Sequence, residues 1–151
     1  MKLANALSQR SELQTRIRQL ESRLCNNALV QEGEHPAEEP AELLQELEQN
    51  YARLEELIAA INRTNSVTMV EEASLSDLLA HRDCLTGKIN VLRNFLQNAS
   101  AVVHRRTASE IKIKSAVNVR ELQKQVDAYA KELRELDEAI QEKNWTTELV
   151  Q

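Results

Sequence analysis

Hydrophobic residues recur every three or four positions along four long stretches of the chain. The first stripe contains Leu3, Ala6, Leu13, Ile17, Leu20 and Leu24. The second contains Leu44, Leu47, Tyr51, Leu54, Ile58, Ile61 and Asn65, flanked by Leu43 and Leu57. The third contains Leu78, Arg82, Leu85, Ile89, Leu92, Leu96, Ala99 and Val103, and the fourth Val119, Leu122, Val126, Tyr129, Leu133, Leu136 and Ile140. This alternation predicts helices that pack through narrow apolar stripes.

Local signals place the ends of these helices. Pro40 is a favoured first-turn residue, and Ser74 with Asp77 and Asn118 with Glu121 have the spacing of capping boxes. The pattern therefore predicts helices over about residues 2–28, 41–65, 75–103 and 119–144. Each would be about 36–44 Å long at 1.5 Å per residue.

Four helices of similar length predict an all-α fold, an elongated antiparallel four-helix bundle that forms one domain over residues 1–151. Composition agrees, because two Gly and two Pro cannot supply the tight reversals of a β-sandwich or barrel. The residues expected in the core lie mid-helix on their stripes: Leu20, Leu47, Leu54, Ile58, Leu85, Ile89, Leu92, Leu133 and Leu136.

Two connectors between helices have a β-like pattern. Residues 66–73 are unusually apolar for a linker, and residues 110–114 alternate apolar and basic side chains. A straight helix of about 43 Å separates the two segments, so they cannot pair with each other within one chain. Unpaired strand edges recruit other chains, which predicts a homo-oligomer, at least a dimer. The expected contacts are Val67, Met69, Val70, Ile111 and Ile113; the alternative is irregular loops packed on the bundle ends.

Charge and cysteine usage limit the class of protein. The net charge of −5 argues against a general nucleic-acid binder. Nine Glu against one Arg lie between residues 30 and 57, whereas residues 102–124 hold six Lys or Arg against two Glu. These opposed patches favour subunit association or the steering of a charged ligand; the alternative is that each is an ordinary solvated surface. The chain shows no signal peptide or membrane span, and two isolated cysteines indicate a cytoplasmic protein.

No complete catalytic or metal-binding set is apparent. Glu32 and His35 have the spacing of a di-iron motif but lie in a Gly/Pro loop, and His81 with Cys84 has no second cluster. The pair Glu55–Glu56 has no third carboxylate at magnesium-binding spacing, and two glycines cannot build a phosphate loop. We therefore expect no metal, cofactor or catalytic residue.

Arg82 interrupts an apolar stripe and therefore needs a carboxylate or a ligand anion as partner. One interpretation is a salt bridge that fixes the register of the helices. The other is a small-ligand site in which arginines bind an anion, amides donate hydrogen bonds and an indole forms an apolar wall. The candidate residues of that site are Asn62, Arg63, Asn65, Arg82, Asp83 and Trp145.

Four segments together resemble the septicolysin-like family of small bacterial proteins: residues 30–34, 61–65, 123–127 and 144–149. The resemblance implies a compact helical bacterial protein and assigns no activity. Two functions stay open. The stripes, connectors and charge patches favour a non-catalytic, self-associating scaffold or interaction protein. The alternative is a small-ligand-binding protein or enzyme acting on an anionic compound.

Overall fold

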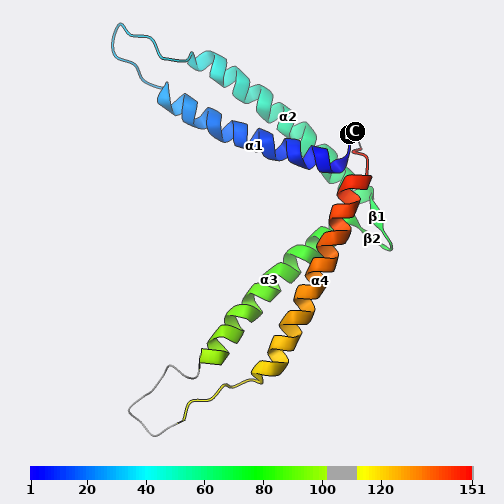
Figure 1. Ribbon diagram of the computed structural model, residues 1–151. Coiled ribbons are helices and arrows are strands. Elements are labelled where there is room, and N and C mark those ends of the chain that lie inside the picture. Colours follow the sequence, from blue (N-terminus) through cyan, green and yellow to red (C-terminus); the bar gives the residue numbers. More distant parts are fainter. Residues whose placement is uncertain (102–111, 151) are drawn as a thin grey trace. The chain divides into compact units, whose positions relative to one another are not determined.

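The computed structural model describes residues 1–101 and 112–150. It contains four α-helices, α1 (Leu3–Asn26), α2 (Pro40–Val67), α3 (Leu75–Ser100) and α4 (Val119–Thr146) (Figure 1). Two short strands, β1 (Met69–Val70) and β2 (Ala73–Ser74), join α2 to α3. The predicted all-α class, a helical bundle with short β connectors, is confirmed. Helix ends fall within two residues of the predicted ones, except that predicted residues 102–103 of α3 lie outside the described residues.

The chain divides into two compact units. Unit 1 comprises Met1–Ser74 with Lys143–Gln151, and unit 2 comprises Leu75–Glu142. α4 therefore contributes most of its length to unit 2 and its last turn to unit 1. The single domain expected from the sequence stays a prediction, which one cooperative unfolding transition would support.

In unit 1, α1 and α2 form an antiparallel pair (Figure 1). Two residues of the predicted α2 stripe are buried, Leu54 and Ile61. The other buried residues lie one position before members of that stripe: Leu43, Asn50, Leu57 and Thr64. Leu44 and Tyr51, which belong to the predicted stripe, stay 53% and 52% exposed. α2 carries two adjacent apolar stripes, and α1 covers the earlier one.

Polar contacts fix the connection between α1 and α2. The side-chain amide of Asn27 donates to the carbonyl of Arg23 at 2.8 Å, and its oxygen accepts from the backbone N–H of Glu38 at 3.0 Å. The guanidinium of Arg23 donates to both carboxylate oxygens of Glu38 and lies 3.5 Å from Glu46. This hydrogen bonding lowers the pKa of Glu38. The loop therefore returns to α2 in a defined geometry.

The two ends of the chain are fastened together within unit 1. Lys2 pairs with Glu148 in an antiparallel bridge, flanked by hydrogen bonds from Leu3 N to Thr147 O at 2.9 Å and from Leu149 N to Met1 O at 2.8 Å. The carboxylate of Glu148 lies 2.8 Å from the Lys2 ammonium and 3.0 Å from the N-terminal ammonium. The Lys2 hydrogen bond is the largest contribution to the lowered pKa of Glu148.

The connector after α2 folds back on itself. β1 pairs antiparallel with β2, with Met69 opposite Ser74 and Val70 opposite Ala73, and Glu71 adopts a φ of 56° in the turn. The expectation that residues 67–70 have no strand partner within their own chain is therefore wrong. A tight turn supplies a neighbouring strand that the sequence pattern did not reveal. In the other connector residues 112–114 form no strand, and Ile111 lies outside the described residues.

In unit 2, α3 and α4 form a second antiparallel pair. Its buried apolar residues are Leu75, Leu85, Ile89, Leu96, Val126 and Ile140. Across the pair, His81 Nε2 lies 2.9 Å from Glu132 Oε1, and the Lys88 ammonium lies 3.8 Å from the centre of the Tyr129 ring. At the start of α4, Asn118 accepts a hydrogen bond from Glu121 N at 3.2 Å, which confirms the predicted N-cap.

Five residues expected in the core are only partly buried: Leu47, Ile58, Leu92, Leu133 and Leu136. The other four, Leu20, Leu54, Leu85 and Ile89, are buried as predicted. Within each unit a helix packs mainly against one partner, which covers one side of its apolar stripe and leaves the other side open to water. None of the helices in the described part of the chain has a segment apolar and long enough to span a bilayer.

Candidate functional site

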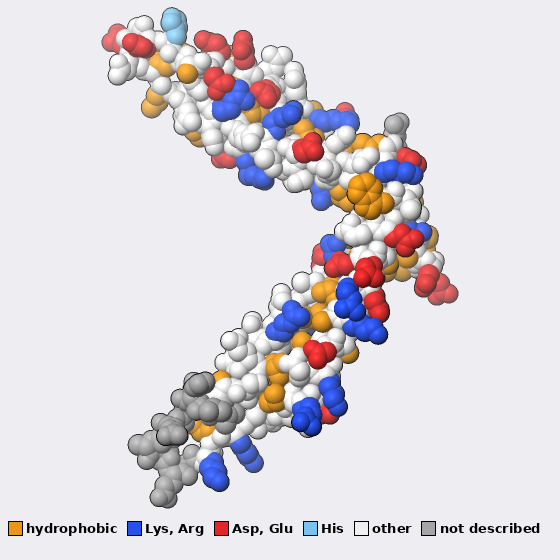
Figure 2. Space-filling view, in the orientation of Figure 1, with side chains coloured by type: hydrophobic (Ala, Val, Ile, Leu, Met, Phe, Trp, Pro, Cys, Tyr) orange, Lys and Arg blue, Asp and Glu red, His pale blue; other side chains and the backbone are white. Residues whose placement is uncertain are grey.

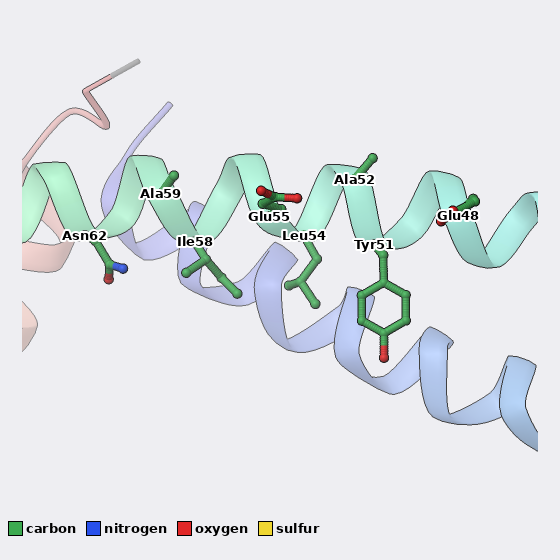
Figure 3. A pocket seen from close by; sticks show the side chains of 8 residues that line it. All are labelled: Glu48, Tyr51, Ala52, Leu54, Glu55, Ile58, Ala59 and Asn62. Atoms are coloured by element: carbon green, nitrogen blue, oxygen red, sulfur yellow. The ribbon is translucent and has the colours of Figure 1, made fainter.

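A shallow apolar groove runs along α2 in unit 1. Its lining comes entirely from that helix: Glu48, Tyr51, Ala52, Leu54, Glu55, Ile58, Ala59 and Asn62. In Figure 3, Tyr51, Leu54 and Ile58 project from α2 on the side of α1. The groove exists because α1 packs on the neighbouring stripe of α2. From residue 48 to residue 62 it measures about 21 Å, or four helical turns.

The charge along this α2 groove is acidic. Of the five glutamates on α2, Glu46 lies near Arg23 and Glu56 pairs with Arg53. Glu48 and Glu55, both on the groove, have no ion-pair partner among the described residues. They lie one heptad apart, which corresponds to about 10 Å along the helix. The α2 groove therefore combines an apolar floor with two unpaired carboxylates.

A second apolar hollow lies on unit 2. Its lining consists of Ala130 and Leu133 together with polar and charged residues, Arg93, Arg134, Asp137, Glu138 and Gln141. Two arginines and two carboxylates give this surface a mixed charge. Figure 2 shows hydrophobic side chains at the surface of both helical pairs, interspersed with charged ones.

The predicted ligand residues of unit 1 do not converge on one hollow. Asn62 lines the α2 groove, whereas Arg63 lines a separate hollow together with Met1, Arg53 and Leu149. Asn65 is partly buried and lines neither of these hollows. The indole of Trp145 is 62% exposed. Asn62 and Arg63 therefore line different hollows, and the small-ligand site stays a prediction.

The predicted ligand residues of unit 2 bind each other. Arg82 donates from Nε and Nη2 to Asp83 Oδ1 at 3.3 and 3.2 Å, and its Nε lies 3.9 Å from Asp137 Oδ1 on α4. A carboxylate from another helix therefore faces Arg82, as the salt-bridge interpretation predicts. The guanidinium side chain is 31% exposed and is not buried in the seam.

The residues predicted as oligomer contacts are largely open to solvent. Val67, Met69 and Ile113 are 63%, 52% and 45% exposed, and Val70 is partly buried. Ile111 belongs to the part of the chain that the structure does not describe. The oligomer contacts stay a prediction.

Thr64 is a structural residue that the sequence pattern missed. Its side chain is fully buried; the hydroxyl donates to Ala60 O at 2.8 Å and accepts from Val150 N at 2.9 Å. Thr64 therefore joins the C-terminal segment to α2. Thr64 is a polar residue on the apolar stripe of α2 next to the predicted one. The local sequence does not indicate that its partner lies 86 residues away.

Side chains of the types that bind metal ions lie in both units. Residues 1–101 and 112–150 contain no group of three or more His, Cys, Asp or Glu side chains arranged to hold a metal ion. Cys25 and Cys84 are both free and exposed.

Comparison with known proteins gives a family and a close structural match. A model described as "Family of unknown function (DUF6847)" matches residues 10–149. A solved structure, described as that of a functionally unknown conserved protein from Corynebacterium diphtheriae, is 44% identical, with a TM-score of 0.92 and 99% of each chain covered. No curated protein matches the chain. The resemblance to septicolysin-like proteins stays a prediction.

Proposed function

We propose that this chain, which belongs to the DUF6847 family of unknown function, is a self-associating helical scaffold or interaction protein without catalytic activity. The observation that carries the proposal is the incomplete burial of residues on the apolar stripes. Leu47, Ile58, Leu92, Leu133 and Leu136 each lie mid-helix, and each is left partly open by its two-helix pair. Contact with a further helix would complete their burial.

Exposed apolar side chains outside the stripes support the same proposal. On α3, Val91 and Phe95 lie one turn apart and are 67% and 48% exposed. Near β1, Val67 and Met69 are exposed to a similar degree. Exposed apolar residues that lie close together are typical of interaction surfaces. The proposed contacts of self-association are Val67, Met69 and Val70 of unit 1 and Ile113 of unit 2. Ile111, which lies outside the described residues, completes the proposed set.

We also propose a cytoplasmic location in a bacterium. Two free, exposed cysteines fit a reducing compartment. The solved relative comes from a bacterium and matches the full length of this chain.

Light scattering coupled to size exclusion at micromolar concentration tests self-association. We expect a mass of at least twice 17.2 kDa. A monomer across the concentration range would contradict the proposal. The double variant Met69→Asp/Ile113→Asp should lower the mass, because it places charge on the proposed surface. Leu29→Asp is the matched control, since Leu29 is 91% exposed in the α1–α2 loop. Equal effects of both variants would refute the location of the surface.

A further inference from the structure

The α2 groove has properties that self-association through the β connectors does not use. Its floor is apolar, with Tyr51 about half exposed and Ile58 and Ala59 partly buried. Its length of about four turns matches a short helix rather than a compact small molecule. Amphipathic helices bind such grooves through apolar residues at positions i, i+3, i+4 and i+7.

Charge decides what kind of helix the groove fits. Glu48 and Glu55 lie one heptad apart, have no ion-pair partner in the described chain, and share the groove with no Lys or Arg. A partner helix with basic residues seven positions apart would place a cation beside each carboxylate. Such pairs raise the association rate and exclude acidic helices.

A second copy of α2 is a poor occupant for the same reason. In an antiparallel pair of α2 helices centred on Tyr51, Glu48 of one copy would lie near Glu55 of the other copy, along the same edge of the helix–helix contact. Like charges placed opposite each other across an interface cost binding energy and suppress the wrong partner. The groove is therefore not complementary to itself.

We infer that the α2 groove binds an amphipathic helix of a partner protein whose apolar stripe is flanked by Lys or Arg at seven-residue spacing. The partner's aliphatic side chains pack on Tyr51, Leu54 and Ile58, and its cations pair with Glu48 and Glu55. A contact only four turns long is small beside the roughly 1,200–2,000 Å² interfaces of stable complexes, so we expect weak, transient binding. This inference adds a partner protein to the proposed interaction role and does not require self-association through the β connectors.

Fluorescence anisotropy with two labelled 18-residue peptides tests the inference. Both peptides carry Leu at the a and d heptad positions; one has Lys at e and g, and the other has Glu there. Against the wild-type chain we expect the Lys peptide to bind at least tenfold more tightly than the Glu peptide. The variant Glu48→Lys/Glu55→Lys should reverse that preference, and Tyr51→Ser should weaken both peptides. Absence of Lys-peptide binding up to about 1 mM overturns the inference.

A matched control separates the groove from the overall charge. Glu12→Lys/Glu42→Lys changes the net charge by the same amount at exposed sites outside the groove, and it should keep the wild-type preference. If this control reverses the preference as well, bulk electrostatics explains the binding and the groove does not. Light scattering on Tyr51→Ser adds a second check. Loss of self-association in this variant would indicate that another copy of the chain occupies the groove. That result would overturn the proposal of a different partner protein.

Discussion

Truncation of two neighbouring residues on α3 tests whether each helical pair buries one side of its stripe. Ile89 is 2% exposed, whereas Leu92 lies one turn further on and is only partly buried. Replacing either side chain by alanine removes three carbons. At about 0.8 kcal/mol per buried methylene group, the transfer contribution for Ile89 is about 2.4 kcal/mol, and the cavity left in the packed seam adds to it.

We therefore expect Ile89→Ala to lower the free energy of unfolding by about 3–4 kcal/mol. Leu92→Ala should lower it by about 1–2 kcal/mol, because solvent already reaches part of that side chain and no closed cavity forms. Both residues belong to unit 2, so the same unfolding transition reports both changes. Urea unfolding followed by circular dichroism at 222 nm measures the difference, provided that the m-values agree.

If the two variants of the monomeric protein lose unfolding free energy equally, within 0.5 kcal/mol, the idea that α3 is covered on only one side is refuted. Protein concentration provides a further distinction. If a second chain covers Leu92, the cost of Leu92→Ala should grow as the protein associates, while the cost of Ile89→Ala should change much less.

Three further predictions concern polar contacts. Thr64→Val keeps the shape of the buried side chain but removes the acceptor for Val150 N, so we expect a loss of about 1 kcal/mol in urea unfolding. An unchanged midpoint would contradict the idea that this hydrogen bond fastens the C-terminal segment. Because the hydrogen bond from Arg23 lowers the pKa of Glu38, its stabilising effect is complete above the ordinary glutamate value of about 4.3 and is lost as pH falls further. The wild type should therefore lose more stability between pH 7 and pH 3 than Glu38→Gln, and parallel pH profiles would refute this. Arg82→Met should change stability by less than about 1 kcal/mol, since the ion pair is partly exposed; a loss above 3 kcal/mol would show that the guanidinium is structurally essential.

The amino-acid pattern by itself determined the helices and most of their ends. A three–four alternation of apolar residues, with Pro40 and Asn118 at helix starts, was sufficient because these signals act over a few neighbouring residues. The pattern also identified which face of α1, α3 and α4 carries the buried apolar residues. The salt-bridge interpretation of Arg82 followed because a charged side chain in an apolar stripe needs an opposite charge as partner.

Tertiary structure decided which of two adjacent stripes on α2 is buried. Leu43 and Leu57 lie beside Leu44 and Ile58, so periodicity alone could not select between them; packing against α1 did. The same selection leaves Tyr51 exposed and creates the α2 groove. The β1–β2 pairing and the Thr64–Val150 hydrogen bond likewise depend on where the chain returns in space. Local sequence encodes an apolar face, but its partner is chosen only when distant segments meet.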